Sequence, residues 1–472
     1  MLSNEIIIQL EEIVGSNYIF IDQETLDTYG RDHTEDLVFP PQVLVKPGST
    51  LEISLLMKVA TQYKIPVVPI GARTGLSGGI LAVHKGIGLS LERLNMIEYI
   101  DEKNLQVITQ PGVITEVLQK AVAEKGLFYP VDPSSKGSCF IGGNIAENSG
   151  GARAVKYGVT QDYVLNLEVV LPNGEIIYTG ANTLKNATGY NLTQLFVGSE
   201  GTLGIVTKII LKLIPAVKSN VLMLVPFYKM EEAAEAVSAI FRAGIVPSAL
   251  EFMERDAIDW TTKYCDVPDL NLNDEIQAHL LIEVDGNYPG IFMQEAEKIL
   301  EVVEQYQVDE ILFADTEEQK NSLWKLRRNV AEAVKQNTVY KEEDTVVPRF
   351  ELPKLLMGIK AIGSKYGFKS ICYGHAGDGN LHVNIVKLDM DDHHWKTIVP
   401  EGIKEIFQLT KKLNGTISGE HGIGLVQKEY MDLVFSEVEL SLMYQIKSVF
   451  DPLNIMNPGK IFPSRIESKH HA

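Results

Sequence analysis

The sequence predicts a multi-domain α+β protein. Its 472 residues are too many for one simple core, and at about 150 residues per domain they suggest roughly two or three domains. The first half alternates short β-branched runs with glycine clusters, whereas the second half alternates apolar strands with amphipathic helices of ordinary length. These patterns favour separate mixed helix-and-sheet domains packed on one another.

The first large domain is expected over residues 36–215, after a helical N-terminal segment at residues 1–35. The amphipathic run near the N-terminus predicts a short helix. Turn signals such as Pro172-Asn173-Gly174 separate the strands and indicate many loops. The expected strands cover residues 42–45, 66–70, 105–110, 167–171 and 205–213.

The second domain is expected over residues 216–424, where the rhythm of the sequence changes. Its apolar strands include residues 221–225, 279–284 and 311–314. A helical segment follows at residues 425–463. The charged tail at residues 464–472 is expected to lack regular structure.

The amino-acid composition disfavours some classes of binding partner and indicates the cellular compartment. A net charge of −19 disfavours binding to nucleic acids or anionic membranes, because both would repel the protein. Cys139, Cys265 and Cys372 are widely separated and provide neither a disulfide framework nor an iron–sulfur site. With no apolar run near the roughly 20 residues that span a bilayer, we expect a cytoplasmic protein that meets a membrane only through a partner.

Two glycine-rich loops in the first domain are candidates for binding a large anionic ligand. Residues 70–79 follow an apolar strand and present consecutive backbone N–H groups, as a diphosphate requires. Residues 141–151, preceded by Asp132-Pro-Ser-Ser135, again combine glycines with small hydroxyl side chains. Each loop taken alone is also compatible with a plain turn.

These loops, together with residues 197–206 and Asn457-Pro-Gly-Lys460, resemble the FAD-binding domain of the vanillyl-alcohol oxidase flavoprotein superfamily. More narrowly, the chain resembles the group of D-lactate dehydrogenase, D-2-hydroxyglutarate dehydrogenase and the glycolate oxidase flavin subunit. The resemblance implies a two-subdomain FAD-binding domain, a substrate domain with an antiparallel sheet, and a C-terminal helical segment that returns to the FAD domain.

The resemblance also implies how FAD is held. Some relatives attach the flavin covalently through a histidine of the first loop, and this loop has none, so the FAD is expected to be non-covalent. The residues implied to contact it are Gly71, Ala72, Arg73, Thr74, Gly75, Leu76, Ser77, Gly78, Asp132, Pro133, Ser135, Gly142, Gly143, Asn144, Asn148, Ser149, Gly150, Gly151, Glu200, Gly201, Gly204, Ile205 and Asn457.

A second constellation lies at residues 371–385, where Asp378-Gly379 predicts a two-residue hairpin turn between apolar strands. Such a turn places His375 opposite His382 and Tyr373 opposite Asn384. Facing residues have Cβ atoms about 4.5–5.5 Å apart, which lets two imidazoles share one metal ion. An isolated pair of histidines is more often a surface or core pair, so this prediction depends on a third ligand.

Residues 416–424 supply that ligand. Glu420 and His421 are flanked by glycines, so the backbone can turn both side chains into one cavity. Glu420 completes a site of two histidines and one carboxylate for a divalent metal, zinc or manganese, and His421 remains available for proton transfer. The resemblance implies the same ligands, His375, His382 and Glu420, and the same catalytic role for His421.

Arg327 is the candidate anchor for a substrate carboxylate. On a helix it shares an apolar face with Leu323 and Leu326, and a buried arginine requires an anionic partner. An internal acid and a substrate carboxylate satisfy that requirement equally well, and the resemblance favours the substrate. Relatives of the 2-hydroxyglutarate type carry a lysine where this chain has Glu342, which argues against a second substrate carboxylate.

The predicted reaction oxidises a small D-2-hydroxy acid to the 2-oxo acid, with Asn384 orienting the substrate and the hydride passing to flavin N5. The electrons must then leave to a quinone, a cytochrome, an electron-transfer protein or an iron–sulfur partner subunit. The alternatives are a flavin subunit of a glycolate oxidase complex, a metallohydrolase using the same metal centre, and a catalytically silent FAD-binding subunit. A homodimer is compatible with each.

Overall fold

The computed structural model describes residues 2–34, 37–267 and 273–471. The chain forms two compact units. The first unit comprises Met1–Ser149, Val159–Ala216 and Glu420–Ala472, and the second comprises Gly150–Gly158 and Val217–Gly419. The chain therefore crosses between the units four times. Two of these crossings, at residues 149–150 and 419–420, fall within sequence segments that were predicted to bind ligands.

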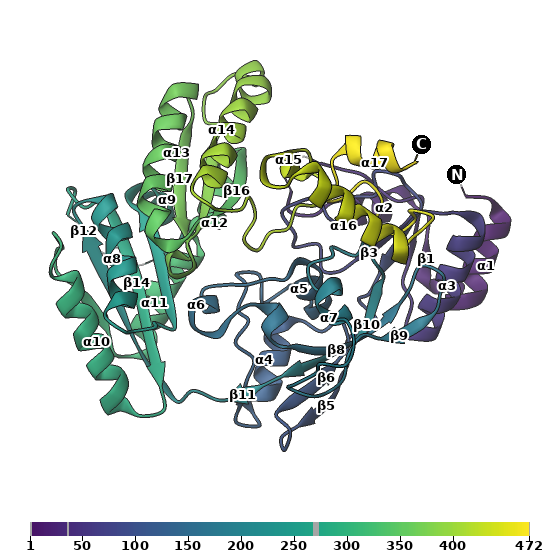
Figure 1. Ribbon diagram of the computed structural model, residues 1–472, viewed down its shortest axis with the longest axis horizontal. Coiled ribbons are helices and arrows are strands. Elements are labelled where there is room, and N and C mark those ends of the chain that lie inside the picture. Colours follow the sequence, from purple (N-terminus) through teal and green to yellow (C-terminus); the bar gives the residue numbers. More distant parts are fainter. Residues whose placement is uncertain (1, 35–36, 268–272, 472) are drawn as a thin grey trace. The chain divides into compact units, whose positions relative to one another are not determined.

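Two sheets form the framework of the first unit (Figure 1). One has four strands in the order β1 (Ile19–Phe20), β2 (Val43–Val45), β4 (Ile87–Ser90) and β3 (Val67–Ile70), and the last three are parallel. The other has five antiparallel strands in the order β5 (Ile97–Asp101), β6 (Gln106–Thr109), β10 (Ile205–Lys212), β8 (Val164–Val170) and β9 (Ile176–Tyr178). A short pair joins β11 (Ile214–Pro215) to β7 (Leu127–Phe128).

Each sheet of the first unit has its own apolar core. The parallel sheet packs against α1 (Asn4–Val14) and α3 (Thr50–Tyr63), and the five-stranded sheet packs against α4 (Thr115–Ala123) and α5 (Ile141–Glu147). Shorter helices are α2 (Gln23–Tyr29) and α7 (Leu192–Phe196). The parallel strands are short and buried and read as continuous apolar runs, as strands covered on both faces do.

The C-terminal segment packs within the first unit although it is distant in sequence from the parallel sheet. Met456 forms a β-bridge with Val67, and α16 (Glu437–Phe450) begins at Ser436, whose side chain forms a capping box with Glu439. The predicted helical stretch is broken, because α15 (Met431–Val434) ends before this cap. The helices appear in yellow in Figure 1.

The expectation that the tail after Pro463 lacks regular structure is wrong. Residues Ser464–His471 form α17, and Ile466 is fully buried in a cluster with Met431, Leu440 and Tyr444. A single apolar residue in a charged segment was too weak a pattern to predict a helix, but here it completes an existing core.

A seven-stranded antiparallel sheet organises the second unit. Its order is β15 (Leu312–Ala314), β12 (Ser219–Phe227), β14 (Ala278–Gly286), β13 (Ala249–Glu254), β17 (Lys369–Gly374), β18 (Asn380–Val386) and β16 (Tyr340–Val346). This confirms the expected antiparallel sheet.

Helices cover both faces of this sheet. One face packs against α9 (Arg255–Tyr264), α11 (Glu317–Arg328) and α12 (Val330–Asn337) in a common apolar core. The other helices of the unit are α6 (Ala154–Tyr157), α8 (Met230–Arg242), α10 (Pro289–Val303), α13 (Leu352–Tyr366) and α14 (Val399–Lys412). Register shows that Glu251, Tyr373, His382 and Asn384 all project from the face that carries α11.

Among the residues that the structure describes, no helix combines the length and the apolar character needed to cross a membrane.

His279 makes the stability of the second unit depend on pH. It lies fully buried in β14, neither ring nitrogen has a hydrogen-bond partner among the described residues, and burial lowers its pKa to about 3. Imidazole in an unfolded chain titrates near about 6.5. Below that pH the unfolded chain therefore binds a proton that the folded chain excludes, and the free energy of unfolding falls.

We expect His279→Gln to remove this dependence. The wild type should lose about 1.4 kcal/mol more unfolding free energy per pH unit than the variant, from about pH 6.5 towards pH 3. Trp260, Trp324 and Trp395 all lie in the second unit, so tryptophan fluorescence during denaturant unfolding follows this unit alone. If the unfolding free energies of the wild type and His279→Gln change equally with pH, His279 is protonated in the folded state.

Candidate functional site

Four segments predicted to bind the cofactor meet in the first unit. Gly71 lies against Gly143, with an ideal Cβ on Gly71 4.0 Å from the Gly143 backbone. Gly198 N donates to Ile145 O at 2.9 Å, and Asn457 Nδ2 donates both to Gly79 O at 2.9 Å and to Glu200 O at 2.8 Å. Loops separated by more than 300 residues in the sequence thus form one surface.

The glycines of these loops have two different roles. A Cβ on Gly142 would lie 2.6 Å from Pro111, and one on Gly204 would lie 2.8 Å from Val169, so both positions require glycine for packing. A Cβ on Gly143 would meet nothing within 4 Å, and one on Gly71 or Gly75 would only reach contact distance. The backbone at these three positions is open, as close approach by a ligand requires.

Several side chains predicted to contact the cofactor also make hydrogen bonds or ion pairs within the protein. Asn144 Nδ2 donates to Thr115 Oγ1 at 2.7 Å, and Asn148 Oδ1 accepts from Gln161 N at 2.9 Å. Asp132 forms an ion pair with Lys136 at 3.4 Å. These residues therefore stabilise the shape of the loops.

The remaining predicted positions lie on the same elements. Ala72, Arg73, Thr74, Leu76 and Gly78 belong to the first loop, Pro133 and Ser135 lie in the turn before α5, Ser149 follows α5, and Gly201 and Ile205 lead into and begin β10. Gly150 and Gly151 differ, because they begin the segment of the second unit that contains α6.

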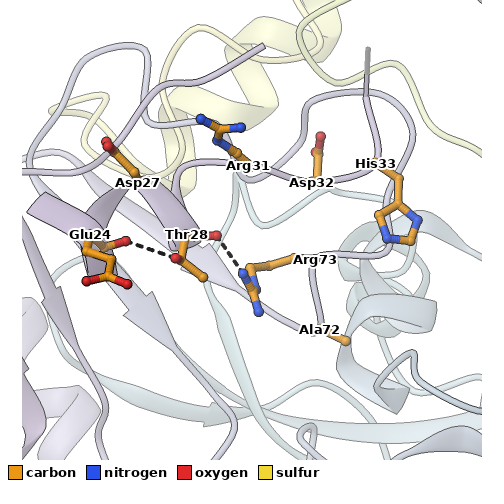
Figure 2. A pocket seen from close by; sticks show the side chains of 8 residues that line it. All are labelled: Glu24, Asp27, Thr28, Arg31, Asp32, His33, Ala72 and Arg73. Atoms are coloured by element: carbon orange, nitrogen blue, oxygen red, sulfur yellow. Dashed lines mark hydrogen bonds between the residues drawn. The ribbon is translucent and has the colours of Figure 1, made fainter. Parts of the chain in front are cut away.

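A cavity of ≈ 680 Å³ lies beside the first glycine loop (Figure 2). Its lining includes Ala72 and Arg73 of the loop together with Thr28, Arg31 and His33. Arg73 Nη1 donates to Thr28 O at 2.5 Å, and its guanidinium lies 4.5 Å from the centre of the Tyr29 ring. The sequence interpretation did not include the α2 side of this cavity.

Buried carboxylates lie behind the loops. Burial raises the pKa of Glu200 to about 7, and its carboxylate accepts from Ile423 N at 2.8 Å and Gly424 N at 2.6 Å. Burial and the neighbouring Glu200 raise the pKa of Glu147 well above its usual value. Glu200 thus holds the backbone that follows the Glu420-His421 pair.

That pair begins the last segment of the first unit. Ser77 Oγ donates to His421 O at 2.6 Å, so the histidine backbone is tied to the first glycine loop. Gly422 has φ +78, and a Cβ there would lie 2.0 Å from Glu147 Oε2, which explains the glycine after the histidine. The backbone of His421 is therefore fixed independently of its side chain.

In the second unit, the structure brings His375 and His382 together, but through a different turn from the predicted one. Tyr373 pairs with His382 and Ile371 with Asn384, so the predicted register is wrong by two residues. The connection is a 3-10 turn over Ala376–Asp378 that ends at Gly379 in the left-handed region. Because the shift is even, the side chains keep their face.

The two imidazoles lie 5.2 Å apart between ring centres, at an interplanar angle of 85°. Both residues are 5% exposed. His375 Nδ1 is 2.8 Å and 2.9 Å from the two carboxylate oxygens of Glu251. An ionised carboxylate only accepts hydrogen bonds, so this contact is compatible with a proton on Nδ1 of His375. A neutral imidazole protonated there would present Nε2 to a metal ion.

Arg327 also contacts Glu251. Its Nη2 lies 2.7 Å from Glu251 Oε2, and its guanidinium lies 4.8 Å from the centre of the Tyr373 ring. Of the two anionic partners considered for Arg327, an internal acidic residue is thus present, and it is Glu251. Arg327 Nε and Nη2 are both buried and make no hydrogen bond to the described residues, so the contact of Nη2 with Glu251 is an ion pair.

Asp344 organises the end of the hairpin. Its carboxylate accepts from Asn380 Nδ2 at 2.7 Å and Gly419 N at 2.8 Å, and it lies 3.5 Å from His382 Nδ1. A Cβ on Gly419 would lie 2.7 Å from Asn380 Nδ2. Asp344 therefore fixes the backbone immediately before Glu420 next to the strand that carries His382.

Asn384 lies on the same face. Its Nδ2 donates to the Tyr373 hydroxyl at 3.1 Å, and that hydroxyl lies 3.4 Å from Glu342 Oε1. Asn384 is fully buried, yet its Oδ1 accepts no hydrogen bond from the described residues. Buried polar atoms without partners are rare and point to a missing ligand.

The sequence analysis assigned no role in the site to Glu251, Asp344 or Tyr373. A signal for Glu251 was present, because a carboxylate inside the apolar run Ala249–Glu254 is unusual in a strand whose residues are all buried. Its partners His375 and Arg327 come from distant segments, so the sequence alone did not link them.

Two family models match the chain. Residues 41–180 match an "FAD binding domain", and residues 216–461 match the "FAD linked oxidases, C-terminal domain".

Three relatives align along most of the chain. "Glycolate oxidase subunit GlcD" of Bacillus subtilis is 39% identical over 98% of this chain and 97% of its own length. "D-lactate dehydrogenase" of Anaerostipes hadrus is 40% identical over 89% of each protein. "D-2-hydroxyglutarate dehydrogenase" of Stutzerimonas stutzeri is 34% identical over 98% of this chain and 100% of its own length.

Solved structures confirm the predicted fold type. p-Cresol methylhydroxylase with bound substrate superposes with a TM-score of 0.81 at 16% identity, covering 97% of this chain and 96% of that protein. 4-Ethylphenol oxidase from Gulosibacter chungangensis gives 0.75 at 19% identity, covering 98% and 99%. Both support the vanillyl-alcohol oxidase type of fold.

Proposed function

This chain belongs to the family of FAD-linked oxidases, and from that premise we propose that it oxidises a small D-2-hydroxy acid to the 2-oxo acid. The observation that carries the proposal is a buried face of the second unit with complementary unpaired groups. Arg327 Nε offers a donor for a carboxylate, and Asn384 Oδ1 offers an acceptor for a hydroxyl. A 2-hydroxy acid presents both groups on adjacent atoms.

We propose that His375, His382 and Glu420 hold a divalent metal ion, zinc or manganese. The two imidazoles are close and nearly perpendicular, and the contact of His375 Nδ1 with Glu251 is compatible with Nε2 as the metal-binding atom. Glu420 directly follows Gly419, whose amide is fixed by Asp344. Two histidines and one carboxylate leave an open position for substrate.

We propose that FAD lies along the open glycine backbone of the first unit, at Gly71, Gly75 and Gly143. When bound, FAD supplies the hydride acceptor, and the metal supplies a Lewis acid for the substrate hydroxyl and carboxylate. Arg327 Nε would pair with the substrate carboxylate while Glu251 stays paired with Nη2. Asn384 would orient the hydroxyl, and the His421 imidazole would accept the hydroxyl proton.

The test is anaerobic mixing of the FAD-loaded protein with D- and L-lactate, glycolate and D-2-hydroxyglutarate, with divalent metal present. Loss of oxidised-flavin absorbance with at least one D-isomer or with glycolate is expected. A flavin that stays oxidised with every acid would rule out the proposal. The matched FAD-binding domain already favours an oxidoreductase over a metallohydrolase.

A glycolate oxidase complex is the second candidate, and the identity to a glycolate oxidase subunit over nearly the whole chain favours it. In that case the reduced flavin would pass electrons to an iron–sulfur partner. Copurification of an iron–sulfur subunit would support the complex, whereas a quinone, cytochrome or electron-transfer protein acting alone would support the self-sufficient dehydrogenase.

Glu342 is expected to select against dicarboxylic substrates. It faces Asn384 across β16 and β18, so a second substrate carboxylate on this face would meet a like charge. Glu342→Lys should raise the ratio of kcat/KM for D-2-hydroxyglutarate to that for D-lactate by roughly tenfold or more, the equivalent of about 1.4 kcal/mol. Glu342→Gln should give an intermediate ratio. Unchanged ratios in both variants would place Glu342 outside the substrate site.

A further inference from the structure

Glu251 contacts two residues of the proposed site that have different proposed roles. Its carboxylate contacts His375, a proposed metal ligand, at 2.8 Å and Arg327, the proposed substrate anchor, at 2.7 Å. The Glu251 side chain is 1% exposed and that of Arg327 is 5% exposed. All three belong to the second unit, on β13, α11 and the turn after β17.

The geometry links the two partners through a single atom. Oε2 of Glu251 lies 2.7 Å from Arg327 Nη2 and 2.9 Å from His375 Nδ1, and Oε1 lies 2.8 Å from the same imidazole nitrogen. The carboxylate cannot rotate to favour one partner without lengthening its contact to the other. Burial removes water as an alternative partner for either residue.

We propose that Glu251 is a positioning residue that fixes the Nδ1–H tautomer of His375 and holds the guanidinium of Arg327, so that metal affinity and substrate-carboxylate binding are coupled through one side chain. This inference rests on the proposed function. Outer-shell carboxylates on metal-binding histidines act in this way in general, and their loss costs roughly 10- to 100-fold in metal affinity.

A second buried glutamate in the same strand provides a matched control. Glu254 lies three residues along β13, on the opposite face, and pairs with Lys360 at 2.6 Å. Its side chain is 5% exposed. Glu254→Gln therefore removes a buried ion pair from the same strand without touching His375 or Arg327.

The first test measures metal affinity by chelator competition on the FAD-loaded protein, using Mn²⁺ and Zn²⁺. Glu251→Gln should bind metal roughly 10- to 100-fold more weakly and should raise KM for the reactive 2-hydroxy acid, with partial rescue by Glu251→Asp. Glu254→Gln should keep wild-type affinity and KM. Equal metal affinity in Glu251→Gln and Glu254→Gln would overturn the proposal.

The second test reads the histidine tautomer in the wild type and uses one variant only to assign the signal. Nitrogen NMR of metal-free protein labelled at histidine should show His375 as the Nδ1–H tautomer, assigned by its loss in His375→Gln. An Nε2–H tautomer would contradict the proposal. Neither tautomer nor metal affinity requires turnover, so failure of every acid to reduce the flavin would refute the function and leave this inference separately testable.

Discussion

His421→Ala is expected to keep both FAD and metal but to lose flavin reduction by substrate, by about 10²- to 10⁴-fold in rate, because a positioned general base contributes that much. The variant should fold, since the backbone of this segment is held by Ser77 at His421 O and by Glu200 at Ile423 N. Stopped-flow absorbance under anaerobic conditions measures the rate directly.

His393→Ala is the control for this experiment. His393 is exposed in the second unit and lies outside the proposed site, so its removal should leave the rate of flavin reduction unchanged. If His421→Ala reduces its flavin as fast as His393→Ala, another group takes the hydroxyl proton and the proposed role of His421 is wrong.

His382→Ala is expected to lose its bound metal ion while the protein stays folded. A ligand is removed outright, so the fall in metal affinity should exceed the roughly 10- to 100-fold cost of losing an outer-shell partner. Flavin reduction should fail in parallel, while FAD content stays at the wild-type level because the glycine loops lie in the first unit. Mass spectrometry of bound metal after dialysis gives the stoichiometry.

His394→Ala is the matched control for metal binding. His394 lies in the same unit, after the end of β18, and its Nε2 is 2.7 Å from Tyr366 O. The substitution should lower local stability and leave the metal content of the protein unchanged. Equal metal content in His382→Ala and His394→Ala would remove His382 from the ligand set.

The fold was predictable where sequence patterns are local. The β-branched runs at residues 66–70 and 205–213 became β3 and β10, and the apolar run at residues 279–284 lies within β14. The resemblance implied that the C-terminal segment returns to the first domain, whereas the excursion at 150–158 was not predicted, because it depends on long-range contacts. Lys156 Nζ, for example, bonds Asp285 Oδ1 at 2.6 Å, 129 residues away.

In the hairpin, the predicted turn and register were wrong, yet His375 and His382 still lie close together. Asp378-Gly379 favours a two-residue turn in isolation. In the protein the preceding residues form a 3-10 turn instead, and Arg349 donates to Gly377 O across it. The register moves by two residues, which is one full period of a strand, so His375 and His382 still share a face.

The buried acids of the site could not be assigned from the sequence, because their role lies in their partners. Glu251 and Glu254 occupy one strand, and only the three-dimensional structure shows that one contacts His375 and the other Lys360. Arg327 was recognised as needing an anion. The structure supplies Glu251 as that anion and still leaves the guanidinium Nε unpaired within the described chain.

The most direct test of the central claim is anaerobic mixing of metal-free, FAD-loaded protein with the most reactive 2-hydroxy acid, before and after Mn²⁺ or Zn²⁺ is restored. We predict that the flavin stays oxidised without metal and is bleached when metal returns, with 2-oxo acid formed in equal amount to the reduced FAD. Full bleaching of the metal-free protein at the same rate would contradict the proposed metal site.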